Sequence, residues 1–232
     1  MKNLDKHYEL LSKLYLRLNG YIVSNLIIHS NENGNSNSEL DILGIRMPFH
    51  KQTDRKVSTS AFLECRKDRI EIIIADVKNK TNPKNIKFND GLRKKDSSIK
   101  KLIEWIGCYE KIDNKCLEKF KLYLNSHKSD NLISFAQFKE DFTFGSVNFK
   151  FTFFCPQLNK WNKRGYKYID YSEMSNFIWK CLNNNEPIDT CSRVYSFKGW
   201  DVFENYVTFF KGYKESPSRS EFENHFKNIP FK

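Results

Sequence analysis

Three charged residues on two predicted strands have the types and the spacing of a metal-dependent hydrolytic site. Asp76 and Lys78 lie at the end of the apolar segment 69–78, and because side chains alternate along a strand, both point to the same face. Asp41 lies in a shorter strand segment at 39–45. Buried charges are rare unless they are paired or bind a metal. If the two strands are neighbours, two carboxylates converge beside a lysine.

Such a cluster has the chemistry of a Mg²⁺ site that acts on phosphodiesters. Mg²⁺ is usually held by one or two carboxylates, and it keeps waters and a position for a substrate phosphate. When bound, it lowers the pKa of a water and screens negative charge in the transition state. Lys78 would orient the attacking water or stabilise the developing negative charge. We therefore expect Mg²⁺ as the cofactor, with Mn²⁺ as a substitute.

The elements that must position these residues alternate between helices and strands. The spacing of apolar residues predicts helices at 5–18, 97–110, 114–125 and 171–182. Apolar or aromatic runs predict strands at 21–28, 39–45, 69–78, 132–138 and 149–154. The near-continuous apolar run at 70–75 is typical of a central strand covered on both faces, whereas the apolar residues of 39–45 alternate imperfectly. This order predicts an α/β fold with one central mixed sheet flanked by helices.

The predicted core covers residues 1–185, and residues 186–232 form a small C-terminal helical appendage. Asparagines at 183–185, followed by Pro187, mark the boundary. Helices are predicted in the appendage at 201–211 and 218–227. The appendage would serve target recognition, packing or a dimer contact.

Length and composition exclude several classes of protein. The 232 residues can bury one sizeable core, and the aromatic fraction of 15% argues against a disordered chain. No apolar stretch approaches the ~18–20 residues that span a bilayer, and the N-terminus lacks the apolar region of a secretory signal. The six cysteines are far apart and form no C-x-x-C pair, which indicates reduced thiols. We expect a cytoplasmic protein without a membrane partner.

The formal net charge of +11 fits either a soluble lysine-rich chain or a protein that binds a polyanion. Much of the excess follows Lys78 directly, because residues 79–101 contain only two acidic residues, Asp90 and Asp96. The candidates for phosphate contacts there are Lys80, Lys84, Lys87, Arg93, Lys94 and Lys95. A solvated basic loop is the alternative, but its place beside the carboxylates favours a nucleic-acid partner. Residues 161–167 also interleave aromatic and basic side chains, as single-strand binders do, although such aromatics more often pack.

The arrangement of these residues resembles the PD-(D/E)xK nuclease superfamily, which has the restriction-endonuclease-like fold. The matching residues are Glu9, Asp41, Asp76, Val77 and Lys78. The order of the predicted elements also fits the family core, and the segment YELLSKLYLRLNGYIV is similar to the first helix, glycine turn and strand of the restriction-endonuclease branch. In that branch an acidic residue in the first helix helps to hold the metal, and Glu9 has this place relative to Gly20-Tyr21.

The resemblance implies a three-layer restriction-endonuclease-like core and a role for each matching residue. Lys78 would be the catalytic lysine. The implied metal ligands are Asp41, Asp76, Glu9 and the Val77 carbonyl. The chain departs from the family pattern in two places, because Leu40 replaces the proline and a long insertion at 48–69 separates the two aspartates. The resemblance covers about residues 5–182.

Each of these residues also has an explanation without chemistry. Asp41 could cap backbone amides, and the Asp-x-Lys motif could be a polar strand end. Glu9 could be a solvated helix residue that pairs with Lys13 at i+4. Glu39 shares the face of Asp41, so it could be a ligand of a second metal or a strand-edge acid.

These observations predict a Mg²⁺-dependent nuclease that hydrolyses phosphodiester bonds in DNA. By resemblance its role would be restriction or phage defence, and a homodimer is possible. Two alternatives stay open: a catalytically inactive nucleic-acid-binding or assembly module on the same fold, and an RNA-directed nuclease. No residue pattern separates DNA from RNA as the substrate.

Overall fold

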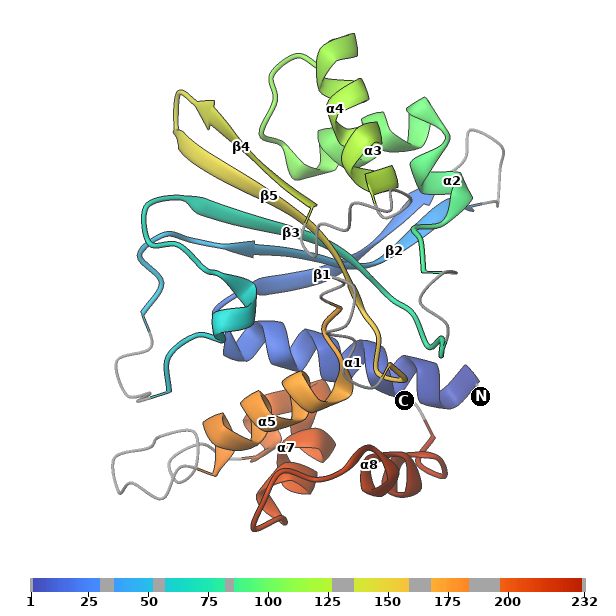
Figure 1. Ribbon diagram of the computed structural model, residues 1–232, viewed down its shortest axis with the longest axis vertical. Helices are drawn as coiled ribbons and strands as arrows, with labels where there is room; N and C mark the ends of the chain where they lie inside the picture. The colour runs from blue at the N-terminus through green and yellow to red at the C-terminus, as the bar shows by residue number, and fades with distance from the viewer. Residues whose placement is uncertain are drawn as a thin grey trace.

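Five strands form one mixed sheet, in the order β1-β2-β3-β5-β4, in the computed structural model of the chain (Figure 1). Their bounds are Ile22–His29 for β1, Ser36–Arg46 for β2, Ile70–Val77 for β3, Ala136–Phe142 for β4 and Gly145–Phe154 for β5. β3 pairs antiparallel with β2 and parallel with β5, whereas β1–β2 and β4–β5 are antiparallel. The prediction of an α/β fold with a mixed sheet is confirmed.

The structure describes seven stretches of the chain, at 2–29, 36–51, 57–81, 86–126, 136–158, 168–183 and 197–230. The predicted strand at 132–138 is therefore described only from residue 136, where β4 begins, and β4 continues to Phe142. β4 and β5 form a hairpin in which Phe142 pairs with Gly145, so the turn lies at residues 143 and 144.

Helices cover both faces of the sheet (Figure 1). One face carries α2 (Asp90–Arg93), α3 (Asp96–Ile106) and α4 (Asn114–Asn125). The other face carries α1 (Lys2–Leu18), α5 (Tyr171–Leu182), α7 (Glu204–Lys211) and α8 (Arg219–Phe226). α4 and α5 have the predicted bounds. The predicted helix at 97–110 ends at Ile106, because Gly107 takes a left-handed conformation (φ 72°) and its N–H donates to the Ile103 carbonyl.

β3 is the central strand, and its side chains enter two separate cores. Ile73 and Ala75 pack with residues of α1 and α5, whereas Ile72 and Ile74 pack with residues of α3 and α4. Residues 71–76 are all buried. A strand that is covered on both faces needs apolar residues at consecutive positions, which explains the uninterrupted apolar run.

β2 has a bulge at the position of Asp41. Ser24 of β1 pairs with Leu43, but Leu26 pairs with Leu40, so two β2 residues, one of them Asp41, oppose a single β1 residue. Leu40 and Leu43 therefore both face the core beneath α3 and α4. The bulge explains why apolar and polar residues alternate imperfectly along this strand in the sequence. A bulge changes the direction of a side chain, and here it turns Asp41 toward β3.

The insertion between β2 and β3 is held against the sheet by a buried ion pair. It contains a short 3₁₀ helix, η1 (Ala61–Leu63), within the segment predicted as an insertion. Lys150 Nζ of β5 lies 2.9 Å from Glu71 Oε2 of β3 and donates to the Leu63 carbonyl at 2.5 Å. Glu71 Oε1 accepts the Arg66 N–H at 3.2 Å. The ion pair thus connects β3 and β5 to residues 63–66 of the insertion.

α7 and α8 pack into the same core as α1 and α5. Phe222 and Phe226 of α8 belong to one buried cluster with Tyr8 of α1. Tyr206 of α7 stacks on Phe226, with ring centroids 4.6 Å apart. The predicted boundary at residues 185–186 lies outside the described residues, and the described C-terminal helices contribute side chains to the main core.

Five of the six cysteines lie in the described residues. These five cysteines are free thiols, and Cys116, Cys155 and Cys181 are buried. No helix in the described part of the chain is long and apolar enough to cross a membrane.

Candidate functional site

Asp76 and Lys78 form an ion pair at the end of β3. Lys78 Nζ lies 2.8 Å from Asp76 Oδ2, and the side chain of the lysine is 17% exposed while that of the aspartate is 1% exposed. The two residues therefore lie on the same face, as the alternation predicted, and Val77 packs against the opposite core. The Lys78 N–H donates to the Phe154 carbonyl of β5 at 2.8 Å, which fixes the backbone of the motif.

Asp41 reaches the same place from the neighbouring strand. Its Oδ2 accepts the Val77 N–H at 2.8 Å, and its own N–H donates to Asp76 Oδ1 at 3.4 Å. The last regular pair between β2 and β3 is Ile42 with Ala75. The side-chain hydrogen bonds of Asp41 and Asp76 therefore link the two strands one residue beyond the end of the ladder. The structure thus brings the two carboxylates together beside the lysine.

Burial makes both carboxylates hard to ionise. The pKa of Asp76 is raised to about 6, chiefly by burial and further by the charge of Asp41, while the Lys78 ammonium opposes this rise. The pKa of Asp41 is also raised, chiefly by burial, and the Val77 N–H and Lys78 oppose this effect. A bound cation would favour the ionised form of both groups.

Glu9 lies on α1 as a charged neighbour of this pair. Its pKa is raised, first by burial and then by the negative charge of Asp41, while Lys13 and Lys6 lower it. Within the described ranges, no three His, Cys, Asp or Glu side chains are close enough together to hold a metal ion by themselves. Asp41 and Asp76 therefore form a two-carboxylate set, and the roles of Glu9, Glu39 and the Val77 carbonyl as ligands stay predictions.

The two-carboxylate set fits Mg²⁺. Mg²⁺ binds through one or two carboxylates and completes its shell with waters and substrate phosphate. Asp76 Oδ2 is buried and accepts no hydrogen bond with regular geometry, and the ammonium of Lys78 is its cationic partner. A buried carboxylate oxygen that faces a positive charge is a position that a hard cation can take.

Four of the predicted phosphate-contact residues are exposed, namely Lys80, Lys87, Lys94 and Lys95. Lys87 and Lys94 lie 3.9 and 2.5 Å from the Asp90 carboxylate. Exposed ion pairs of this kind are weak, so they leave both ammonium groups able to exchange Asp90 for a phosphate. Lys84 and residues 161–167 lie outside the described residues.

Arg93 is placed differently from the prediction. Its side chain is only 2% exposed and pairs with Asp90. Nε donates to the Phe88 carbonyl at 3.1 Å, and Nη1 donates to Asn125 Oδ1 at 2.9 Å. The buried guanidinium thus ties α2 to α4, which argues against the predicted contact of Arg93 with nucleic acid.

Asn89 is a residue of the site that the sequence did not reveal. It precedes α2 as the N-cap, yet its side chain makes no capping bond with that helix. Its Oδ1 accepts a hydrogen bond from Lys78 Nζ at 3.4 Å, and its Nδ2 donates to the Glu39 carbonyl at 3.4 Å. In the sequence, Asn before Asp90-Gly91 indicates only a turn or a helix start.

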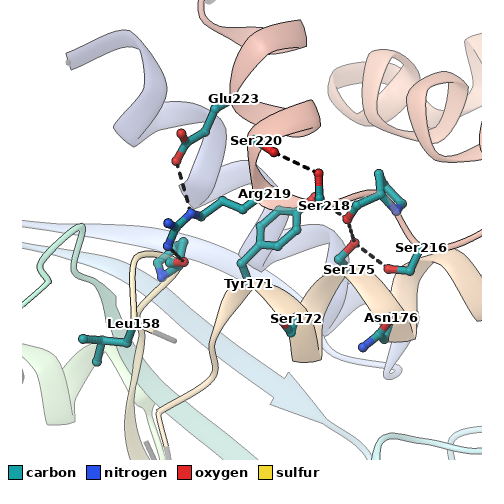
Figure 2. A pocket seen from close by; sticks show the side chains of 12 residues that line it. Leu158, Tyr171, Ser172, Ser175, Asn176, Ser216, Ser218, Arg219, Ser220 and Glu223 are labelled. Atoms are coloured by element: carbon teal, nitrogen blue, oxygen red, sulfur yellow. Dashed lines mark hydrogen bonds and ion pairs between the residues drawn. The ribbon is translucent and has the colours of Figure 1, made fainter. Parts of the chain in front are cut away.

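Two hollows in the surface are built from other residues. One, of about 410 Å³, lies between the start of α5 and the segment that leads into α8 (Figure 2). Its hydroxyl groups bond within the protein: Ser175 Oγ donates to the Pro217 carbonyl at 2.9 Å and lies 2.8 Å from Ser216 Oγ. The other, of about 650 Å³, lies between β1 and α3 beside Trp105. Neither is lined by the predicted site residues.

Comparisons with models of known protein families, with curated proteins and with solved structures gave no match. The candidate function therefore depends on the geometry of the Asp41, Asp76 and Lys78 cluster and on the chemistry that such a cluster supports.

Proposed function

We propose that the chain is a Mg²⁺-dependent nuclease of the PD-(D/E)xK type, with a restriction-endonuclease-like core, that hydrolyses phosphodiester bonds in DNA. The observation that carries the proposal is a pair of carboxylates on β2 and β3, each of which accepts a backbone N–H from the other's strand, with Lys78 in an ion pair to one of them. The order α1-β1-β2-β3, followed by helices and by β5 parallel to β3, supports it further. A role in restriction or phage defence follows from the resemblance alone.

Each residue of the cluster has a distinct task in this proposal. Asp41 and Asp76 hold Mg²⁺, which when bound supplies a Lewis acid and a water of lowered pKa. Lys78 keeps its ammonium at the partly exposed end of β3, where it can orient a water or balance charge on the phosphate. The exposed residues Lys80 and Lys94 contact phosphates of the nucleic-acid backbone.

Cleavage of supercoiled plasmid DNA in the presence of Mg²⁺ tests the proposal. We expect Asp76→Ala and Lys78→Ala each to lower the cleavage rate by roughly 10²–10³-fold, because each removes a group that stabilises charge in the transition state. Circular dichroism should show that both variants stay folded. Glu118→Ala, which removes an exposed carboxylate from α4, is the matched control and should cleave like the unmodified chain.

Cleavage that is undiminished in both variants, or that continues in EDTA, would contradict the proposal. Single-stranded and double-stranded DNA and RNA in the same assay decide the class of substrate. Cleavage of RNA with no cleavage of DNA would leave the metal site in place and change only the substrate.

An inactive nucleic-acid-binding module on the same fold is the second candidate. It is favoured by one observation, that no third acidic or histidine side chain in the described residues joins Asp41 and Asp76 in a metal-holding group. Isothermal titration with Mn²⁺ separates the two. Binding that is lost in Asp76→Ala supports the nuclease, whereas DNA binding without Mn²⁺ binding supports the module.

A further inference from the structure

We propose that Asn89 is a positioning residue, which receives the Lys78 ammonium when a divalent cation binds to the Asp41–Asp76 pair. The inference rests on the proposed nuclease function, because it concerns the same carboxylates. In the structure Lys78 Nζ lies between two acceptors, 2.8 Å from Asp76 Oδ2 and 3.4 Å from Asn89 Oδ1. The lysine therefore already contacts Asp76, which we expect it to leave, and Asn89, which we expect to receive it.

The ammonium and a divalent cation compete for one oxygen atom. Asp76 Oδ1 accepts the Asp41 N–H, so Oδ2 is the atom left for a cation, and Lys78 Nζ now pairs with it. Two positive charges at a single buried carboxylate oxygen repel each other strongly. Cation binding therefore requires Lys78 to leave Asp76 and to find another acceptor nearby.

Asn89 is oriented to be that acceptor. An Asn at an N-cap ordinarily accepts an N–H of its own helix, and Asn89 makes no such bond. Its Nδ2 instead donates to the Glu39 carbonyl of β2, which turns Oδ1 toward Lys78. Because the amide is neutral, it can hold the ammonium without attracting the metal away from the carboxylates.

The short helix that follows Asn89 is fixed from its other side. Arg93 bonds to the Phe88 carbonyl and to Asn125 of α4, and Leu92 is buried in the core beneath α3 and α4. These contacts set the place of Asn89 relative to the end of β3. The acceptor is thus held by packed elements and does not depend on a free loop.

A double-mutant cycle of Mn²⁺ affinity, measured by isothermal titration calorimetry, tests the inference. Asn89→Ala should weaken Mn²⁺ binding about threefold, because the displaced ammonium loses a hydrogen bond. Lys78→Met removes the competing charge and should tighten Mn²⁺ binding by about threefold or more. In the Lys78→Met background, Asn89→Ala should have almost no effect, since the ammonium that it serves is gone.

The control separates this effect from a general change of charge. Lys100→Met removes one positive charge from an exposed position on α3 and should leave Mn²⁺ affinity unchanged. If Asn89→Ala weakens binding equally with and without Lys78, Asn89 acts on the fold and the inference is overturned while the proposed function stands. If the intact chain binds no Mn²⁺, the proposed function itself fails, and the inference fails with it.

A second measurement needs no substitution of Lys78. The Cε and Nζ nuclear magnetic resonance signals of Lys78 should shift when the intact chain is titrated with Mg²⁺, because the ammonium changes its acceptor. In Asn89→Ala the signals should reach a different end point. Signals that stay unchanged up to Mg²⁺ saturation in the intact chain would overturn the inference.

Discussion

Asp76 is a buried carboxylate whose ionisation opposes folding. Burial raises its pKa from the ordinary value of 3.8 to about 6. Because the folded-state pKa lies above the unfolded-state value, the folded chain holds this proton more tightly than the unfolded chain. Stability is therefore lost as the pH rises from about 4 through about 6. Residues retained at such a cost are typical of functional sites.

We predict that Asp76→Asn stabilises the protein in EDTA. The free energy of unfolding should rise by about 1–3 kcal/mol above pH 7, because the amide brings no charge into the interior. Below about pH 4, where the carboxyl is protonated in both states, the gain should disappear. Urea denaturation across this pH range measures it, with the exposed Glu118→Gln as control. A variant that is less stable than the unmodified chain at neutral pH would contradict the prediction.

The sequence was sufficient to place some of these residues and not others. Asp76 and Lys78 could be assigned to one face because alternation along a strand depends only on local geometry. Arg93 and Asn89 could not be assigned, because their partners Asn125 and the Glu39 carbonyl are distant along the chain. The packing of α2 against α4 and β2 determines whether the side chains of Arg93 and Asn89 contact other protein groups or are exposed to solvent.

At the scale of elements, the helices were predictable where one amphipathic face determines them. α4 and α5 have the predicted bounds, whereas the predicted helix at 201–211 begins only at Glu204 because Asp201 has a positive φ of 50°. For the strands, the hydrophobic pattern of the sequence does not show which residues on different strands are paired. Glu71 and Lys150 lie within buried strands, and only the parallel pairing of β3 with β5 shows that each neutralises the other.

We predict that Lys150→Met lowers the free energy of unfolding by about 3–5 kcal/mol, because it leaves the Glu71 carboxylate buried without its counter-ion. Urea denaturation at neutral pH measures the loss. Lys139→Met, an exposed lysine on β4, is the matched control and should change stability by less than about 0.5 kcal/mol. The double variant Glu71→Met/Lys150→Met should recover part of the loss. A loss below about 1 kcal/mol in Lys150→Met would mean that the pair does not hold the insertion.

At the scale of the whole molecule, the C-terminal helices and the sheet should unfold together. Phe222 is fully buried against Tyr8 of α1, so Phe222→Ala should cost about 3–5 kcal/mol and keep one cooperative transition. Far-ultraviolet circular dichroism and tyrosine or tryptophan fluorescence should report the same midpoint. Phe144→Ala, at an exposed turn, is the control. Two separate transitions would show that the C-terminal helices are an independent unit after all.

Under the proposed function, the net charge of +11 leads to a prediction about DNA binding. Each lysine that contacts a phosphate releases counterions, so its loss should reduce the slope of log K against log salt by about 0.9. The double variant Lys80→Met/Lys94→Met should therefore reduce the slope by about 2, measured by fluorescence anisotropy of DNA binding in EDTA. Lys100→Met should not change it, because that lysine lies on α3 and is not one of the predicted phosphate-contact residues. Arg93→Met should lower stability and leave the slope unchanged, because the guanidinium is buried and already bonded within the protein. An unchanged slope in the double variant would place the DNA-contacting surface on another face, away from the carboxylates.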